Sequence, residues 1–157
     1  MPGRGRGELS EEALAVLKGQ SHTPEQFLAC GLSTLMPVRG FISQRFVQDN
    51  LFPERSHRGI DIAGKLGAPL VAAAAGKVLF DAWSPFFGNC RMIAHRDGYL
   101  TFYGHNKINL KKVQDEVKRG EPIALLGTSG NSSAPHLHFE IWKDGEPVDP
   151  LKMLQVK

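Results

Sequence analysis

Residues 136–141 alternate between polar and apolar side chains, and this period of two is typical of a β-strand with one face in a core. The apolar face comprises Leu137, Phe139 and Ile141. The opposite face comprises His136, His138 and Glu140. We therefore expect one face of this strand to pack in the interior and the other to carry chemistry.

A second group of metal-binding residue types precedes this strand in the sequence, with His57 and Asp61 close together. Two imidazoles and a carboxylate from separate segments are a usual protein contribution to a catalytic zinc, which keeps its fourth position for water. Together with the His-x-His triplet at His136 and His138, these residues predict a zinc site. The chain therefore reads first as a metallohydrolase.

The distribution of histidines supports this interpretation. A single histidine is usually structural, and a His-x-His triplet alone is weak evidence. Three of the six histidines of this chain fall in the two motifs, and His105 ends a third strand-like run. This concentration argues against a chance origin. We expect the remaining two, His95 and His22, to be structural.

From Met36 onward the sequence pattern is typical of a β domain. Short apolar runs are separated by Gly, Pro, Asn and Asp, which predicts strands joined by hairpins. Residues 91–95 and 99–103 flank an Asp97-Gly98 turn and form the clearest hairpin. The predicted fold class is mainly β, an antiparallel β-sheet sandwich or flattened barrel, with a short N-terminal helical segment.

A weak internal repeat favours the same architecture. Residues 67–72 and 120–125 are both Gly-x-Pro entries into an apolar strand that then meets a glycine. Two similar β units fit a sandwich or flattened barrel better than helices on a parallel sheet.

The first 35 residues differ in character, so we divide the chain into an N-terminal segment, 1–35, and a β domain, 36–157. Residues 1–7 read as a flexible basic tail, and capping signals predict short helices over 9–18 and 23–31. These helices are too short to bury a core of their own. We expect them to pack on the β domain, to join a larger assembly, or to shield the site.

Composition bounds the class of protein. The 157 residues fit one domain, and 41% hydrophobic with 22% charged residues is typical of a globular chain. There is no transmembrane run, and a net charge of +3 without a basic stripe argues against nucleic acid as the partner.

Cys30 and Cys90 lack CxxC spacing, so buried free thiols are expected, with one disulfide as the alternative. No signal peptide is visible, so either an export signal was trimmed or the protein travels by another route.

Three motifs resemble, in the same order, those of the lysostaphin-type (LytM) zinc endopeptidases. Residues 57–63 are similar to that family's first metal motif, 103–105 to its middle motif and 136–140 to its signature strand. The loop at 127–131 is also similar. The resemblance covers roughly residues 36–154 and implies an antiparallel core of the duplicated hybrid motif type with an open groove.

Carried over position by position, the resemblance assigns roles to the candidate residues. It implies that His57, Asp61 and His138 bind Zn²⁺ and that His105 and His136 are the catalytic pair beside the metal. The nucleophile would be a water activated by zinc, with the two histidines assisting it. The division of tasks between His105 and His136 stays open.

The resemblance also implies a substrate and a location. The expected function is endopeptidase cleavage of peptide cross-links in bacterial peptidoglycan. The alternative is a catalytically silent module of the same fold that binds cell-wall peptides or activates an amidase. A periplasmic or cell-wall location is expected if a signal was trimmed, and a phage virion or tail location otherwise. Residues 43–48 lack a glycine usual in the family, so the resemblance does not define the groove or the cross-link that is cut.

Two residues near the motifs have two interpretations each. Glu140 shares the strand face of the histidines, so it could accept a hydrogen bond from an imidazole N–H or face solvent. Tyr103, two residues before His105, could line the groove or pack in the core.

Overall fold

The computed structural model describes residues 34–130, 132 and 134–155, which form a mainly β protein. The strands up to residue 94 are β1 (Thr34–Leu35), β2 (Phe41–Gln44), β3 (Ile60–Ala63), β4 (Pro69–Val71), β5 (Gly76–Ser84) and β6 (Gly88–Ala94). The strands that follow are β7 (Tyr99–Asn109), β8 (Glu116–Val117), β9 (Pro122–Leu126), β10 (His136–Lys143), β11 (Glu146–Val148) and β12 (Leu154–Gln155). Short 3-10 helices are η1 (Pro53–Arg55), η2 (Arg96–Gly98) and η3 (Pro150–Lys152). The helices expected over 9–18 and 23–31 lie outside the described residues.

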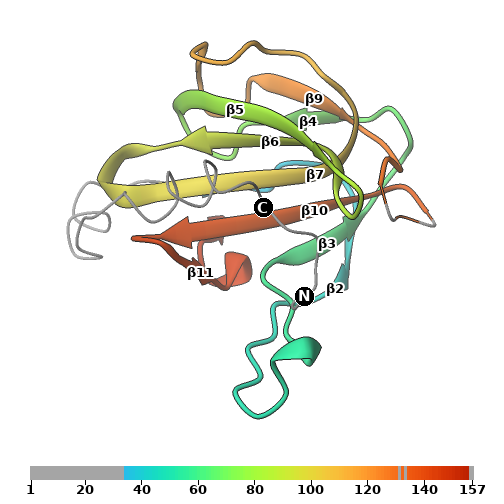
Figure 1. Ribbon diagram of the computed structural model, residues 1–157. Helices are drawn as coiled ribbons and strands as arrows, with labels where there is room; N and C mark the ends of the chain where they lie inside the picture. Colours follow the sequence, from blue (N-terminus) through green and yellow to red (C-terminus); the bar gives the residue numbers. More distant parts are fainter. Residues whose placement is uncertain (1–33, 131, 133, 156–157) are drawn as a thin grey trace.

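One sheet dominates the described part of the chain. Its strands follow the order β2-β3-β10-β7-β6-β5-β8, with β9 beside β7 and β4, and β11 beside β10 (Figure 1). All of its pairings are antiparallel, whereas β1 and β12 form a separate parallel pair. The mainly β, antiparallel prediction is confirmed, and the sheet remains open rather than closing into a barrel.

The internal repeat has a direct structural counterpart. Its two copies supply β4 and β9, which pair with each other, and Leu70 lies opposite Ala124. Both side chains are fully buried. The repeated apolar runs therefore form one antiparallel pair in the core.

The expected hairpin is present as β6 and β7, joined through η2, with Ala94 opposite Leu100. Asp97 has a φ of 60°, a left-handed conformation that Asp tolerates better than most residues. The expectation that His105 ends the second strand is wrong, because β7 runs on to Asn109. The far half of β7 finds a second partner in β9, where Asn109 pairs with Ala124.

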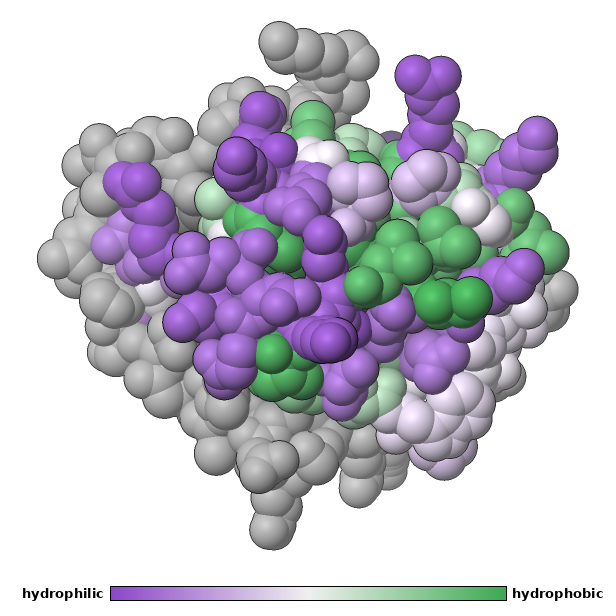
Figure 2. Space-filling model, turned by 90° about the horizontal axis from the view of Figure 1, so that it is seen from above, coloured by the Kyte–Doolittle hydropathy of each residue, from purple (hydrophilic) through white to green (hydrophobic). Residues whose placement is uncertain are grey.

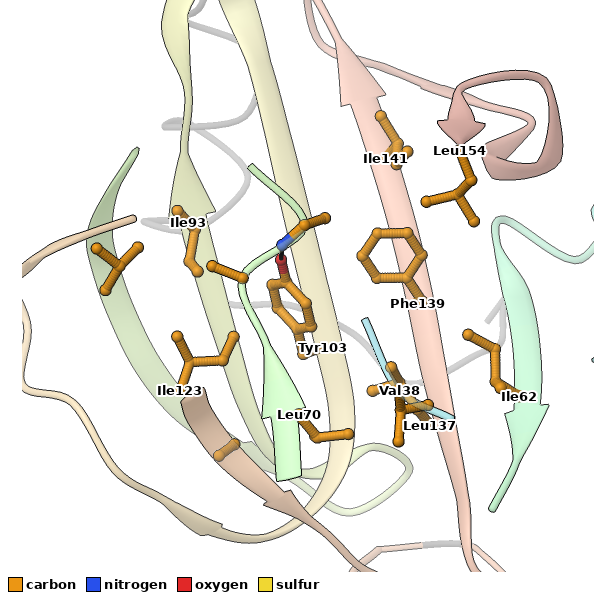
Figure 3. Packing of buried hydrophobic residues seen from close by; sticks show 14 of the residues in the cluster. Val38, Ile62, Leu70, Ile93, Tyr103, Ile123, Leu137, Phe139, Ile141 and Leu154 are labelled. Carbon is orange, nitrogen blue, oxygen red and sulfur yellow. Dashed lines mark hydrogen bonds between the residues drawn. The ribbon is translucent and has the colours of Figure 1, made fainter. Parts of the chain in front are cut away.

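The alternation of β10 divides its side chains between two apolar clusters. The odd-numbered residues Leu137, Phe139 and Ile141 lie in the larger cluster, beside β7 and β3 (Figure 3). The even-numbered Trp142 packs in a smaller cluster that includes Phe87. The face of β10 that carries the histidines therefore lies over the smaller cluster.

The interior settles the interpretation of several single residues. Tyr103 is fully buried and accepts a hydrogen bond from the backbone N–H of Ala73, so it packs in the core. Cys90 is a buried free thiol, and burial together with the charges of Glu140 and Asp81 raises its pKa to about 12. Cys30 lies outside the described residues.

On the face seen from above, hydrophilic side chains lie next to a compact area of apolar side chains (Figure 2). Within the described residues, no helix is both long and apolar enough to cross a membrane.

Candidate metal site

Two neighbouring strands and the loop before them bring the predicted metal ligands together. Asp61 lies on β3 and His138 on β10, and the antiparallel register places these two residues directly opposite each other. His57 precedes β3, at the end of the loop that projects from the sheet in Figure 1. Its backbone exchanges two hydrogen bonds with Val47, which close the base of this loop.

The three side chains form a compact cluster. Oδ1 of Asp61 is 3.3 Å from Nε2 of His57 and 3.0 Å from Nδ1 of His138. All three potential ligand atoms lie within 4.8 Å of one another. Two nitrogens and one carboxylate oxygen at this spacing are a donor set that suits zinc.

The remaining ring nitrogens of the two histidines are also engaged. Nδ1 of His57 donates a hydrogen bond to the carbonyl oxygen of Arg45 at 3.0 Å, and Nε2 of His138 donates to Glu140 at 2.7 Å. A neutral imidazole carries one proton, so with these donations in place the nitrogen that faces Asp61 can offer its lone pair to a metal, which then replaces the hydrogen bond that this nitrogen makes to Asp61 in the metal-free protein. The orientation of both rings therefore fits metal binding.

Glu140 is buried and does not face solvent. Of its two expected roles, it has that of hydrogen-bond acceptor for an imidazole N–H. Its side chain is 1% exposed and also accepts a hydrogen bond from Nε1 of Trp142 at 2.6 Å. Nε of Arg58 lies 3.8 Å from Oε2 of Glu140, the oxygen that also accepts the hydrogen bond from His138. Burial alone would raise the pKa of Glu140, but the charge of Arg58 and the hydrogen bond from His138 lower it to about 2.

Asp61 is ionised for a similar reason. Burial raises its pKa, but hydrogen bonds from His138 and His57 outweigh that effect and hold the pKa well below its ordinary value. A charged carboxylate at the centre of the cluster is the state that a divalent cation requires.

Phe87 forms an apolar wall against the cluster. Its ring stacks on His138 with centroids 4.9 Å apart and an interplanar angle of 23°, and it is fully buried. It also contacts Phe102 edge-on at 5.1 Å. This packing restricts the ring of His138 and shields one of its faces from water.

His105 and His136 lie side by side next to this cluster, with ring centroids 4.6 Å apart. Nδ1 of His105 donates a hydrogen bond to the carbonyl oxygen of Ser129 at 2.8 Å. Burial lowers the pKa of His105 to about 4, and the neighbouring His136 and His138 contribute in the same direction. His105 is therefore a neutral imidazole at neutral pH in the metal-free protein.

His136 is more accessible, and the loop before β10 holds its Nδ1. That nitrogen lies 3.0 Å from the carbonyl oxygen of Ala134 and 3.1 Å from the hydroxyl of Ser132. Its Nε2 lies 3.9 Å from Oδ2 of Asp61. The structure thus brings all five predicted site residues into one place.

Sequence reasoning missed several residues that shape the site. Arg58 and Trp142 contact Glu140, Phe87 stacks on His138, and Ser129 holds His105. Only Trp142 had a local signal, because it continues the alternation of the histidine face of β10.

Comparison with known proteins places this site in context. The model of peptidase family M23 matches residues 55–150. Murein hydrolase activator NlpD from Salmonella dublin is 44% identical over 102 residues, which are 64% of this chain and 27% of that protein. Peptidoglycan DD-endopeptidase ShyB from Vibrio cholerae serotype O1 is 44% identical over 97 residues, 61% of this chain and 22% of that protein. The chain thus matches about a quarter of the length of each of these relatives.

Solved structures agree with the sequence matches. A zinc-containing peptidase from Vibrio cholerae superposes with a TM-score of 0.70 and 32% identity, over 80% of this chain and 40% of that one. The catalytic domain of lysostaphin from Staphylococcus simulans superposes with a TM-score of 0.59 and 26% identity, over 84% of this chain and 97% of that one.

Proposed function

The chain belongs to peptidase family M23, and we propose that it is a zinc-dependent endopeptidase that cleaves peptide cross-links in bacterial peptidoglycan. One observation carries the proposal. His57, Asp61 and His138 form a complete three-residue donor set, and His105 and His136 stand beside it.

In this proposal His57, Asp61 and His138 hold the zinc. When bound, zinc supplies a Lewis acid that makes water nucleophilic near neutral pH and polarises the scissile carbonyl. The carbonyl oxygen of Arg45 and the carboxylate of Glu140 keep the ligand rings oriented by accepting hydrogen bonds from their outer N–H groups.

In this proposal His105 and His136 transfer the protons of the reaction. Each has its Nδ1 beside a backbone carbonyl oxygen, which favours the tautomer with an unprotonated Nε2. Such a nitrogen can accept a proton from the attacking water and return it to the leaving amine, so the protons balance over one cycle. The resulting N–H also stabilises the negative oxygen of the tetrahedral state.

The two relatives point to a substrate class. ShyB is a peptidoglycan DD-endopeptidase and NlpD a murein hydrolase activator, so we assign the substrate to peptidoglycan and favour a DD cross-link over a glycine bridge. Because murein lies in the cell envelope, we propose that location. The alternative of a phage virion has no support from these relatives.

A second function has a specific observation in its favour. The relative NlpD is an activator of murein hydrolases, and it matches this chain at 44% identity. As an activator, this chain would stimulate another hydrolase without cutting peptide bonds itself.

One experiment separates the two functions. Zinc-loaded protein is incubated with purified peptidoglycan of DD-linked and glycine-bridged chemotypes, and the released fragments are identified by mass spectrometry. The His105→Ala variant serves as the control for contaminating hydrolases. New amine and carboxyl ends at the DD cross-link with the wild type alone support the endopeptidase. Two results together would support the activator instead: the protein alone leaves peptidoglycan unchanged, and an added amidase hydrolyses peptidoglycan faster in its presence than in its absence.

A further inference from the structure

The Ser129-Gly130 turn, in the loop between β9 and β10, is wedged against the turn that joins β5 to β6. Gly88 and Gly130 both have a positive φ, 66° and 76°. A Cβ built on Gly88 would lie 2.3 Å from the Ser129 hydroxyl oxygen, and one built on Gly130 would lie 2.3 Å from the backbone nitrogen of Gly88. The two turns can approach this closely only because both positions are glycine.

The Ser129 side chain bridges two strands at this contact. Its hydroxyl donates a hydrogen bond to the carbonyl oxygen of Asn106 on β7 at 2.6 Å and accepts one from the backbone N–H of Asn89 on β6 at 3.0 Å. Asn89 and Asn106 lie opposite each other, and the register of β6 and β7 shifts directly beyond them. The hydroxyl therefore joins the loop to both strands where their regular pairing breaks.

The Ser129 backbone meets His105 at the same point. Its carbonyl oxygen accepts the hydrogen bond from Nδ1 of His105 at 2.8 Å. His105 itself has a φ of 67°, which is rare for a residue other than glycine, and its N–H donates to the carbonyl oxygen of Phe87 at 2.6 Å. The β5–β6 turn thus holds the His105 backbone, and the Ser129 turn holds its ring.

We propose that Ser129 is a positioning residue for His105. The hydroxyl fixes the loop to β6 and β7, and the carbonyl of the same residue then keeps His105 in the Nδ1–H tautomer with Nε2 free. A carbonyl oxygen accepts hydrogen bonds and never donates them, so it selects one tautomer. The catalytic role of His105 in this proposal rests on the proposed function, whereas the claim about its tautomer does not.

The test compares Ser129→Ala with the matched control Thr128→Ala, which removes a hydroxyl from the adjacent, exposed position of the same loop. Zinc content, kcat and KM on a cross-linked peptide, and the ¹⁵N NMR shifts of the histidine rings are measured for both variants. The His105→Gln variant identifies the His105 signals. Thermal unfolding shows whether each variant is folded.

We expect Ser129→Ala to keep its zinc and its KM, to lose kcat by about tenfold or more, and to show mixed tautomers at His105. Thr128→Ala should match the wild type in zinc content, kcat, KM, ring ¹⁵N shifts and thermal unfolding. A single Nδ1–H tautomer and unchanged kcat in Ser129→Ala would overturn the proposal. So would loss of zinc in step with loss of kcat, because Ser129 would then support the fold of the whole site. If the wild type cleaves no peptide, the proposed function fails, while the NMR comparison still decides the positioning role.

Discussion

His138 donates a hydrogen bond from Nε2 to Oε2 of Glu140, over 2.7 Å and between residues two positions apart on the same strand. Both side chains are almost completely buried. Because consecutive even-numbered residues of β10 share one face, the strand itself brings the carboxylate to the ring. The contact leaves Nδ1 of His138 as the nitrogen that faces Asp61.

This relationship predicts the effect of Glu140→Gln. A neutral amide accepts the N–H of His138 less strongly than a carboxylate, so the ring becomes a weaker ligand. We expect zinc affinity to fall by about 10- to 100-fold while the protein stays folded. Competition with a chromophoric chelator measures the affinity, and the exposed Glu146→Gln on β11 is the matched control. Equal affinities for the two variants would show that Glu140 does not support the metal site.

The donor set predicts one zinc per chain. Asp61 and His138 are opposite one another, and removing either leaves two donors where the site needs three. Elemental analysis of protein purified without added metal should find about one equivalent in the wild type and little in Asp61→Ala or His138→Ala. Less than a few tenths of an equivalent in the wild type, with none regained on dialysis against zinc, would contradict the site.

The flanking histidines should behave differently from the ligands. His105→Ala and His136→Ala are expected to retain zinc and to lose most turnover, about 100-fold or more, because their Nδ1 atoms bind protein groups and their roles concern protons. Metal analysis and kcat are measured on the same samples. Loss of zinc in His136→Ala with retention in His138→Ala would reverse the ligand assignment within the His-x-His pair.

His95 predicts part of the pH dependence of stability. Its Nδ1 lies 2.8 Å from the carbonyl oxygen of Ala75 and its Nε2 2.8 Å from the hydroxyl of Thr101. A neutral ring satisfies both contacts, since it donates to the first and accepts from the second. Burial lowers the pKa of His95 from 6.5 to about 4 in the folded protein.

His95 therefore becomes protonated below about pH 6.5 in the unfolded chain, but only below about pH 4 in the folded protein. The free energy of unfolding should fall as the pH drops through this window, by at most about 3 kcal/mol from this residue. Denaturant unfolding of the metal-free protein between these pH values measures the slope. His95→Gln, which cannot titrate, should have a shallower slope than the wild type, and equal slopes would contradict the assignment.

Much of the fold was predictable because strand geometry is local. The alternation of residues 136–141 determines which side chains enter the core and which face the site, whatever the strand pairs with. The same reasoning anticipated the β6–β7 hairpin from its turn residues. It could not anticipate that β7 continues past His105, because that half of the strand depends on pairing with the distant β9.

The sequence by itself determined the residue types of the site, since zinc chemistry needs imidazole and carboxylate donors at particular spacings, and it determined the shared face of His136, His138 and Glu140. Only the tertiary structure decided that His138 lies opposite Asp61, 77 residues away, and that the Ser129 carbonyl holds His105 across 24 residues. These contacts arise from strand register and from the close approach of glycine turns. Both are properties of the packed chain, and local sequence patterns do not encode them.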